Sequence, residues 1–348
     1  MKPKTIRRTS KTGSTKSNEI TANGSSKSQN YLTSTTKAIV KGLACICDRW
    51  DEFWFSQRTH RDLARVRFSL GIAASVYALT WLPSLSQWIA DDGLLSRSQV
   101  EFLIGRGIQD TGSEGRISPL FSLIPSSLVT SYVILAACGC FLAAMGMGGR
   151  VTVIIAWGLL LGIIHRVPML QGPGDYLITG LFGYLVICPG KSIRNTTFSL
   201  TDDPSRSSWL CNLAFRLLQC HLFLWIAASL ASQFGDPIWW NGNAPWWLTF
   251  SGNRSWISMD FWLKYPYLMN LATYSVQGLQ LWILVSLLMP KWRISGIAAM
   301  IAFSILALVI ANDWIYSLAI LSCTTILIPT ILIPGILFPR SATQAGNS

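Results

Sequence analysis

Long apolar runs separated by shorter polar segments constrain this chain more than any other feature. A helix needs about 20 mostly apolar residues to cross the hydrocarbon core of a bilayer, and several runs approach that length. Of the 348 residues, 51% are hydrophobic and only 13% are charged, whereas soluble domains carry about 25% charged residues. We therefore expect an all-α, polytopic integral membrane bundle rather than a soluble protein with one core.

About eight membrane-spanning helices are predicted from the lengths of these runs. The third and fourth are short, which suits a tilted or incomplete crossing. Because only Asn312 and Asp313 separate the last two, a single re-entrant hairpin is an alternative interpretation of that pair. The predicted spans cover residues 66–86, 126–147, 151–167, 175–190, 209–234, 267–289, 294–311 and 314–336.

Positive charge is concentrated before the first span. Half of the 28 Lys and Arg residues lie within residues 1–67. A net charge of +12 is one sign of a protein that binds nucleic acid. The concentration of this charge before the first span is instead typical of a terminus that faces the cytoplasm and its anionic lipids. Lys and Arg are also dense in the short loops, so we expect both termini in the cytoplasm. The long loops 87–125 and 235–266 then lie outside, and the partner is the lipid bilayer rather than nucleic acid.

Three regions are expected along the chain. Residues 1–36 are mostly Ser, Thr, Lys and Asn and predict a disordered basic tail in the cytoplasm, with a transit peptide as the alternative. Residues 37–340 form the transmembrane domain, and residues 341–348 form a C-terminal tail. Inside the domain, residues 38–60 predict either an amphipathic helix on the membrane surface or the first packed helix of the bundle.

Motifs of soluble catalysis are absent from the sequence. It contains no HExxH, no Walker loop and no GxGxxG, and its eight cysteines form no CxxC pair. The three histidines, His60, His165 and His221, are scattered, so we expect neither a metal site nor a disulfide framework. Cys45 and Cys47 flank the membrane entry, where palmitoylation is the alternative to inert packing.

Ionisable side chains at membrane depth are the strongest functional candidates, because they are costly there and usually face the bundle interior. Arg216 and His221 lie on the fifth span, Asp175 opens the fourth and His165 ends the third. We therefore take His221, Asp175 and His165 as catalytic candidates. The structural alternatives are a neutral, hydrogen-bonded His221 and an Arg216 that extends to the cytoplasmic headgroups.

The outer end of the bundle is where these groups are expected to meet. In the predicted topology the third span ends there, the fourth begins there and the fifth ends there. His165, Asp175, His221 and Ser232 would then converge on an outward-facing pocket. The loop 235–266 that follows is rich in Trp, which favours either an interfacial aromatic belt or a ligand platform. The pocket candidates are Arg216, Gln219, Ser232, Trp239 and Trp240.

Several short stretches together resemble a known family. Leu-Ala-Arg-Val-Arg-Phe-Ser-Leu-Gly at 63–71 and Ala-Asp-Asp-Gly-Leu-Leu at 90–95 match its first-span entry and the acidic turn that follows. Gly-Asp-Tyr-Leu at 174–177 matches its fourth-span opening. Arg-Leu-Leu-Gln at 216–219, followed by Trp-Trp-Asn-Gly-Asn-Ala at 239–244, matches its most recognisable signature. In this order and spacing they resemble the HTTM (horizontally transferred transmembrane) family, the bacterial relatives of the membrane part of vitamin K-dependent gamma-carboxylase.

The resemblance implies a bacterial inner-membrane bundle whose site opens to the outside and takes a lipophilic molecule such as a quinone or a lipid. No other cofactor is identified. In the carboxylase, that site couples oxygenation of reduced vitamin K to carboxylation of glutamate. The carboxylase lysine corresponds to the stretch 228–233, which holds serine and no lysine, and its histidine corresponds to Gly174 and Asp175. The lumenal substrate domain also has no counterpart, so we expect no carboxylase activity.

Three classes of function therefore stay open for this chain. The first is binding of a lipophilic molecule, with or without an enzymatic reaction on it. The second is a non-enzymatic scaffold or accessory subunit. The third is a transporter, which the absence of a convincing internal repeat disfavours. An enzyme predicts titratable groups gathered in one cleft, and a scaffold predicts dispersed groups. The sequence does not indicate an oligomeric state.

Overall fold

A computed structural model of the chain describes residues 47–89 (except 49 and 57), 93, 94, 99, 102, 120, 124–166, 170–187, 207–251 and 256–328. The predicted tails, Cys45, the stretch 90–95 in large part and most of the loop 87–125 lie outside these residues. The chain divides into two compact units, Met1–Trp54 and Phe55–Ser348. In the first unit the described residues are helical, and the Trp54 ring meets the rings of Trp50 and Phe53 edge-on.

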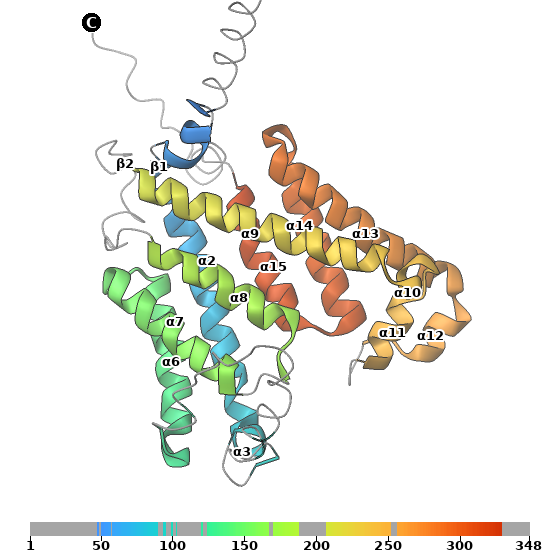
Figure 1. The fold of residues 1–348 in the computed structure, drawn as a ribbon. Coiled ribbons are helices and arrows are strands. Elements are labelled where there is room, and N and C mark those ends of the chain that lie inside the picture. The colour runs from blue at the N-terminus through green and yellow to red at the C-terminus, as the bar shows by residue number, and fades with distance from the viewer. Residues whose placement is uncertain are drawn as a thin grey trace, which may run out of the picture. The chain divides into compact units, whose positions relative to one another are not determined.

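The second unit is a helical bundle (Figure 1). Its described non-helical element is one antiparallel pair of two-residue strands, β1 (Arg58–Thr59) and β2 (Ser207–Ser208). Five described segments are long and apolar enough to cross a membrane. They are Asp62–Trp88, which contains α2 (His60–Thr80) and α3 (Leu85–Trp88), and the helices α7 (Gly149–Arg166), α9 (Trp209–Phe234), α13 (Pro266–Leu288) and α14 (Arg293–Ala311).

Two further helices, α6 (Val129–Ala144) and α15 (Trp314–Leu327), are apolar but shorter. Apart from the short strand pair, the described elements are helical, and together these helices make the chain a multi-pass membrane protein. Their bounds follow the predicted second, third, fifth, sixth and seventh spans closely, and α9 coincides with the prediction of 209–234. Within the described part of the eighth predicted span, the helix α15 ends at Leu327. The total number of crossings and the side of each terminus stay predictions.

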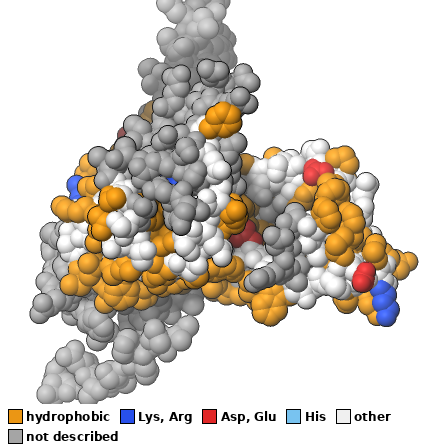
Figure 2. Space-filling view, turned by 90° about the horizontal axis from the view of Figure 1, so that it is seen from below, with side chains coloured by type: hydrophobic (Ala, Val, Ile, Leu, Met, Phe, Trp, Pro, Cys, Tyr) orange, Lys and Arg blue, Asp and Glu red, His pale blue; other side chains and the backbone are white. Residues whose placement is uncertain are grey.

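Exposed apolar side chains fit this assignment. Hydrophobic side chains gather in broad patches on the face shown in Figure 2, and charged side chains are sparse there. On α13 and α14 the exposed apolar residues include Leu271, Leu281, Leu288, Ile301 and Ile305. Such patches are unfavourable in water and suit contact with lipid chains.

The centre of the bundle is occupied by the short helix α8 (Pro173–Tyr184), which packs against α2, α7, α9 and α15. With 12 residues it is shorter than the roughly 20 needed to cross a bilayer, whereas the sequence predicted a span over 175–190. Two glycines allow its close packing. A Cβ on Gly174 would lie 2.5 Å from the Tyr316 backbone nitrogen, and one on Gly183 would lie 2.9 Å from the Trp157 ring.

Local sequence sets several helix ends. Ser208 caps α9, since its hydroxyl accepts a hydrogen bond from the Leu210 N–H, and Gly235 follows the last residue of the helix. Proline at the first helical position, where its missing N–H costs nothing, begins α8 and α13. Asp313 caps α15 by accepting from the Tyr316 N–H at 2.9 Å.

The predicted loop 235–266 connects α9 to α13 and contains three short helices, α10 (Pro237–Trp240), α11 (Ala244–Ser251) and α12 (Met259–Lys264). Caps explain two of them, because Asp236 accepts from the Ile238 N–H and Ser258 accepts from the Phe261 N–H. Asn241 and Gly242 form a turn between α10 and α11, with Gly242 at φ +74°.

Candidate functional site

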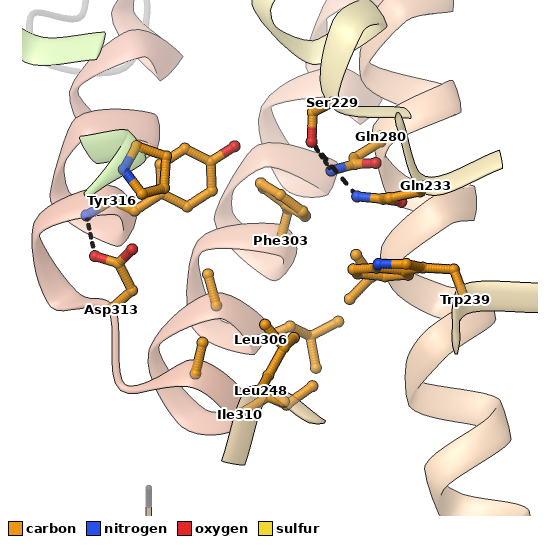
Figure 3. Close-up of a pocket in the computed structure, with 14 residues that line it drawn as sticks. Ser229, Gln233, Trp239, Leu248, Gln280, Phe303, Leu306, Ile310, Asp313 and Tyr316 are labelled. Atoms are coloured by element: carbon orange, nitrogen blue, oxygen red, sulfur yellow. Dashed lines mark hydrogen bonds between the residues drawn. The ribbon is translucent and has the colours of Figure 1, made fainter. Parts of the chain in front are cut away.

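A cavity of about 170 Å³ lies between α9, α10, α11, α13, α14 and the N-terminal ends of α8 and α15. Apolar side chains form most of its described wall, and two groups of polar side chains border it (Figure 3). Ser229, Gln233 and Gln280 lie on one side, and Asp313 lies on the other. The remaining described lining residues are Pro173, Trp239, Leu248, Val276, Phe303, Leu306, Ala307, Ile310, Ala311 and Tyr316.

The amide side of the cavity is centred on the Ser229 hydroxyl. The Gln280 amide nitrogen donates to Ser229 Oγ at 3.2 Å, and the Gln233 amide nitrogen donates to the same atom at 3.4 Å. Gln280 is 2% exposed and Gln233 is 6% exposed, yet neither amide oxygen has a hydrogen-bond partner. A buried acceptor without a partner costs about 1–3 kcal/mol, so this side of the cavity can still accept hydrogen bonds.

The acidic side of the cavity, where Asp313 lies, is near the N-terminal ends of two helices, α15 and α8. Asp313 Oδ1 accepts from the Tyr316 N–H at the start of α15, and Asp175 Oδ2 accepts from the Gly172 N–H at the start of α8 at 2.8 Å. A carboxylate suits a helix N-terminus because of the orphan N–H groups and the helix dipole. The side chain of Asp313 also faces the start of α8, since a Cβ on Gly172 would lie 3.9 Å from its Oδ2.

Burial shifts the protonation of both acids, which lie at helix ends outside the five long spans. Burial raises the pKa of Asp175 to about 6; the hydrogen bond from Gly172 opposes this shift, and the nearby Asp313 charge adds to it. Burial also raises the pKa of Asp313, and the hydrogen bond from Tyr316 opposes that shift. The acidic side therefore takes up protons at a higher pH than exposed carboxylates do.

Of the residues predicted from the sequence, Trp239 lies on the cavity wall. Ser232 is exposed, and its hydroxyl donates to the backbone oxygen of Ser229 at 2.7 Å. Trp240 is also exposed, and its indole N–H donates to the Phe234 carbonyl. Ser232 and Trp240 therefore make local contacts at the end of α9 rather than lining the described cavity.

His221 lies on the side of α9 that faces α8. Its Nδ1 is 3.2 Å from the Tyr184 hydroxyl, with the donor set by the tautomer, and its ring stacks on Trp225 at 6.2 Å between centroids. Gly180 gives the imidazole room, because a Cβ there would lie 3.1 Å from Cε1. Nε2 is buried and makes no hydrogen bond.

The remaining candidates lie elsewhere on their helices. Arg216 donates to the Gln219 side-chain oxygen at 2.9 Å, within α9. His165 is half-buried in the last turn of α7. The described lining of the cavity includes none of the four groups that were expected to converge, His165, Asp175, His221 and Ser232. Their catalytic roles stay predictions.

Sequence reasoning missed Gln280, Asp313 and Tyr316 as lining residues. The apolar run 267–289 holds three amide side chains, Asn270, Gln277 and Gln280, and nothing in the run itself distinguishes the one that lines the cavity. Neutral amides there also need partners and are found between helices. Asp313 was treated only as a separator of two spans.

No group of three or more His, Cys, Asp or Glu side chains within the described part of the chain could hold a metal ion. No family model, no curated protein and no solved structure matches the chain. The geometry of the cavity is therefore the main structural evidence on what this protein does.

Proposed function

We propose that this membrane protein binds a lipophilic small molecule, a quinone or a lipid, in the cavity beside Trp239. The observation that carries the proposal is the cavity itself, about 170 Å³ of space with a mostly apolar wall and polar groups at its border. An apolar cavity of about 150 Å³ can hold a benzene ring. The volume therefore suits one ring or a short piece of acyl chain, with the rest of the ligand outside.

The resemblance to the HTTM family supports the same class of ligand. It also supports a bacterial inner membrane and an outward-facing cavity. Carboxylation is not part of the proposal, because a strong base for hydroquinone deprotonation has no counterpart here. The stretch 228–233 on α9 carries Ser229 and Ser232 in place of a lysine, and the α8 start carries Asp175.

A non-enzymatic scaffold is the second candidate. It is supported by local hydrogen bonds at two of the predicted site residues, since Arg216 pairs with Gln219 and Ser232 pairs with the backbone of its own helix. These contacts lie within α9, and the described lining of the cavity includes neither side chain. Under this alternative the cavity is a packing defect and binds no ligand.

The two candidates are separated by filling the cavity. Ala307 lines it on α14, whereas Ala298 lies on the exposed face of the same helix. Wild type, Ala307→Trp and the control Ala298→Trp are purified in nanodiscs and titrated with decylubiquinone and, separately, with oleic acid. Binding to the folded state raises the unfolding midpoint, by about 2.7 kcal/mol of stability at a hundredfold excess over Kd.

We expect at least one of the two probes to raise the midpoint of wild type and Ala298→Trp but not that of Ala307→Trp. If neither probe stabilises wild type, or if Ala307→Trp responds as wild type does, the cavity is not a binding site and the scaffold is favoured.

A further inference from the structure

We propose that the cavity selects ligands whose polar end is a hydroxyl group, which donates a hydrogen bond to the amides of Gln233 and Gln280. This inference rests on the proposed function and specifies its ligand class. The ligand is a phenol or a long-chain alcohol rather than a carbonyl compound, so of the ligands proposed above a lipid with a hydroxyl group fits and an oxidised quinone does not.

Two buried hydrogen-bond acceptors beside the cavity have no partner. The amide oxygens of Gln233 and Gln280 are buried beside the cavity and accept no hydrogen bond. Both side chains are more than nine-tenths buried, so bulk water does not solvate them. A ligand that supplies a donor removes the cost of leaving them unpaired, whereas a ligand that supplies only acceptors leaves that cost in place.

The second step is a count of protons on Ser229. Amide oxygen and nitrogen are assigned from hydrogen bonds rather than seen directly, so each glutamine has two orientations. A serine hydroxyl carries one proton and two lone pairs. It can therefore donate to one glutamine oxygen at most, and the other glutamine must donate to Ser229. In every arrangement that keeps both contacts with Ser229, at least one amide oxygen stays unpaired.

The third step is the space beside these acceptors. Figure 3 shows the rings of Phe303 and Trp239 near the two amides, with Leu306 and Ile310 farther along the wall. Asp313 is separated from the amide group by Phe303 in this view. A hydroxyl at the amide side would thus carry its ring or chain along apolar side chains, and an isosteric ether or ketone would bury its oxygen opposite another acceptor.

The test compares two pairs of similar probes, in each of which only one member carries a hydroxyl donor. The wild-type protein in nanodiscs is titrated with 4-hexylphenol and its methyl ether 4-hexylanisole, and with 2-dodecanol and 2-dodecanone. Affinities follow from the shift of the unfolding midpoint with probe concentration, after correction for partition into protein-free nanodiscs. The two pairs separate an aromatic from an aliphatic source of the hydroxyl.

We expect the hydroxyl member of at least one pair to bind roughly tenfold more tightly than its partner, the size of one net hydrogen bond. The double variant Gln233→Met/Gln280→Met should lose this preference and still bind both members. Gln277→Met is the matched control, because Gln277 lies one turn away on α13 outside the described cavity lining, and it should keep the preference.

Equal binding of both members of each pair by wild type would overturn the inference and leave the proposed function standing. The same result is expected if a bound water satisfies the two amides. A preference for the ether or the ketone would also overturn it. Failure of all four probes to bind would also overturn the inference, and the proposed function would fail with it only if decylubiquinone and oleic acid likewise leave the unfolding midpoint unchanged. The wild-type comparison decides the question even if the double variant does not fold.

Discussion

Gln280 on α13 donates a hydrogen bond of 3.2 Å to Ser229 on α9, which joins two membrane-spanning helices at the border of the cavity. The same hydroxyl accepts from Gln233, one turn farther along α9. The arrangement leaves the outer atoms of both amides beside the cavity. One small residue therefore contributes to helix packing and to the chemistry that the cavity presents.

Replacing Ser229 should therefore destabilise the bundle. Ser229→Ala removes the acceptor shared by the two amides and leaves their N–H groups buried. We expect unfolding to require about 1–3 kcal/mol less free energy, measured by denaturant titration in detergent. Ser232→Ala is the control, since Ser232 is exposed and bonds only to its own helix, and it should change stability by about 0.5 kcal/mol or less. Equal effects from both substitutions would contradict the assignment.

The contact between α8 and α15 should depend on a glycine. Gly174→Ala places a methyl group 2.5 Å from the Tyr316 backbone nitrogen, and a backbone atom cannot rotate away as a side chain can. The helices must separate, at a cost of about 1–3 kcal/mol. Gly158→Ala on α7 meets nothing within 4 Å and should leave the unfolding midpoint unchanged or slightly higher. Tolerance of Gly174→Ala would show that the two helices do not pack this closely.

Stability should fall as the pH rises through the range set by the buried acids. The pKa of Asp175 rises from its ordinary value of 3.8 to about 6 in the folded protein, so between these values the folded state holds a proton that the unfolded state has released. The free energy of unfolding then decreases with pH, by up to about 1.4 kcal/mol per unit for one proton. Below the ordinary pKa this stabilising effect is complete, and above about 6 it is lost.

Thermal unfolding between pH 4.5 and 8 checks this dependence. Asp175→Asn keeps an oxygen that can accept from Gly172 and removes the titrating group, so the slope between pH 4.5 and 6.5 should flatten. Asp260→Asn, an exposed carboxylate on α12, should keep the wild-type slope. A wild-type midpoint that rises with pH over the same range would contradict the burial of the acids.

The predicted orientation of the bundle is open to chemical labelling. In a cysteine-free variant, Asp260→Cys lies in the segment expected outside, and Lys291→Cys lies in the turn between α13 and α14 that is expected in the cytoplasm. Both positions are exposed. An impermeant maleimide should label intact cells at 260, and at 291 only after permeabilisation. The reverse pattern would invert the topology and place the cavity's outer end in the cytoplasm.

The longest helices could be predicted from hydropathy because a membrane span depends on its own residues. The bounds of α9 and α13 follow from long apolar runs that begin at a cap or a proline. The central position of α8 could not be predicted in this way. Its 12 residues are too few for a span on length alone, and its place depends on glycines that admit neighbouring helices.

The candidate site was less predictable than the fold. Ionisable residues drew attention to His221, which the structure pairs with Tyr184 and stacks on Trp225. The cavity instead depends on two neutral amides, and its opposite border depends on Asp313 in a two-residue turn. Hydropathy gives little weight to single polar residues, because one of them in an apolar run hardly changes the mean hydropathy of that run.

The sequence by itself determined that this chain is a multi-pass helical membrane protein, since the length and apolarity of its runs suit no aqueous fold. Only the tertiary structure decided which polar groups share a space. Helical periodicity places Gln233 and Ser229 one turn apart on α9, but the approach of Gln280 depends on how α13 packs beside that helix. Packing between helices is set by the shapes of many side chains together, and no single segment encodes it.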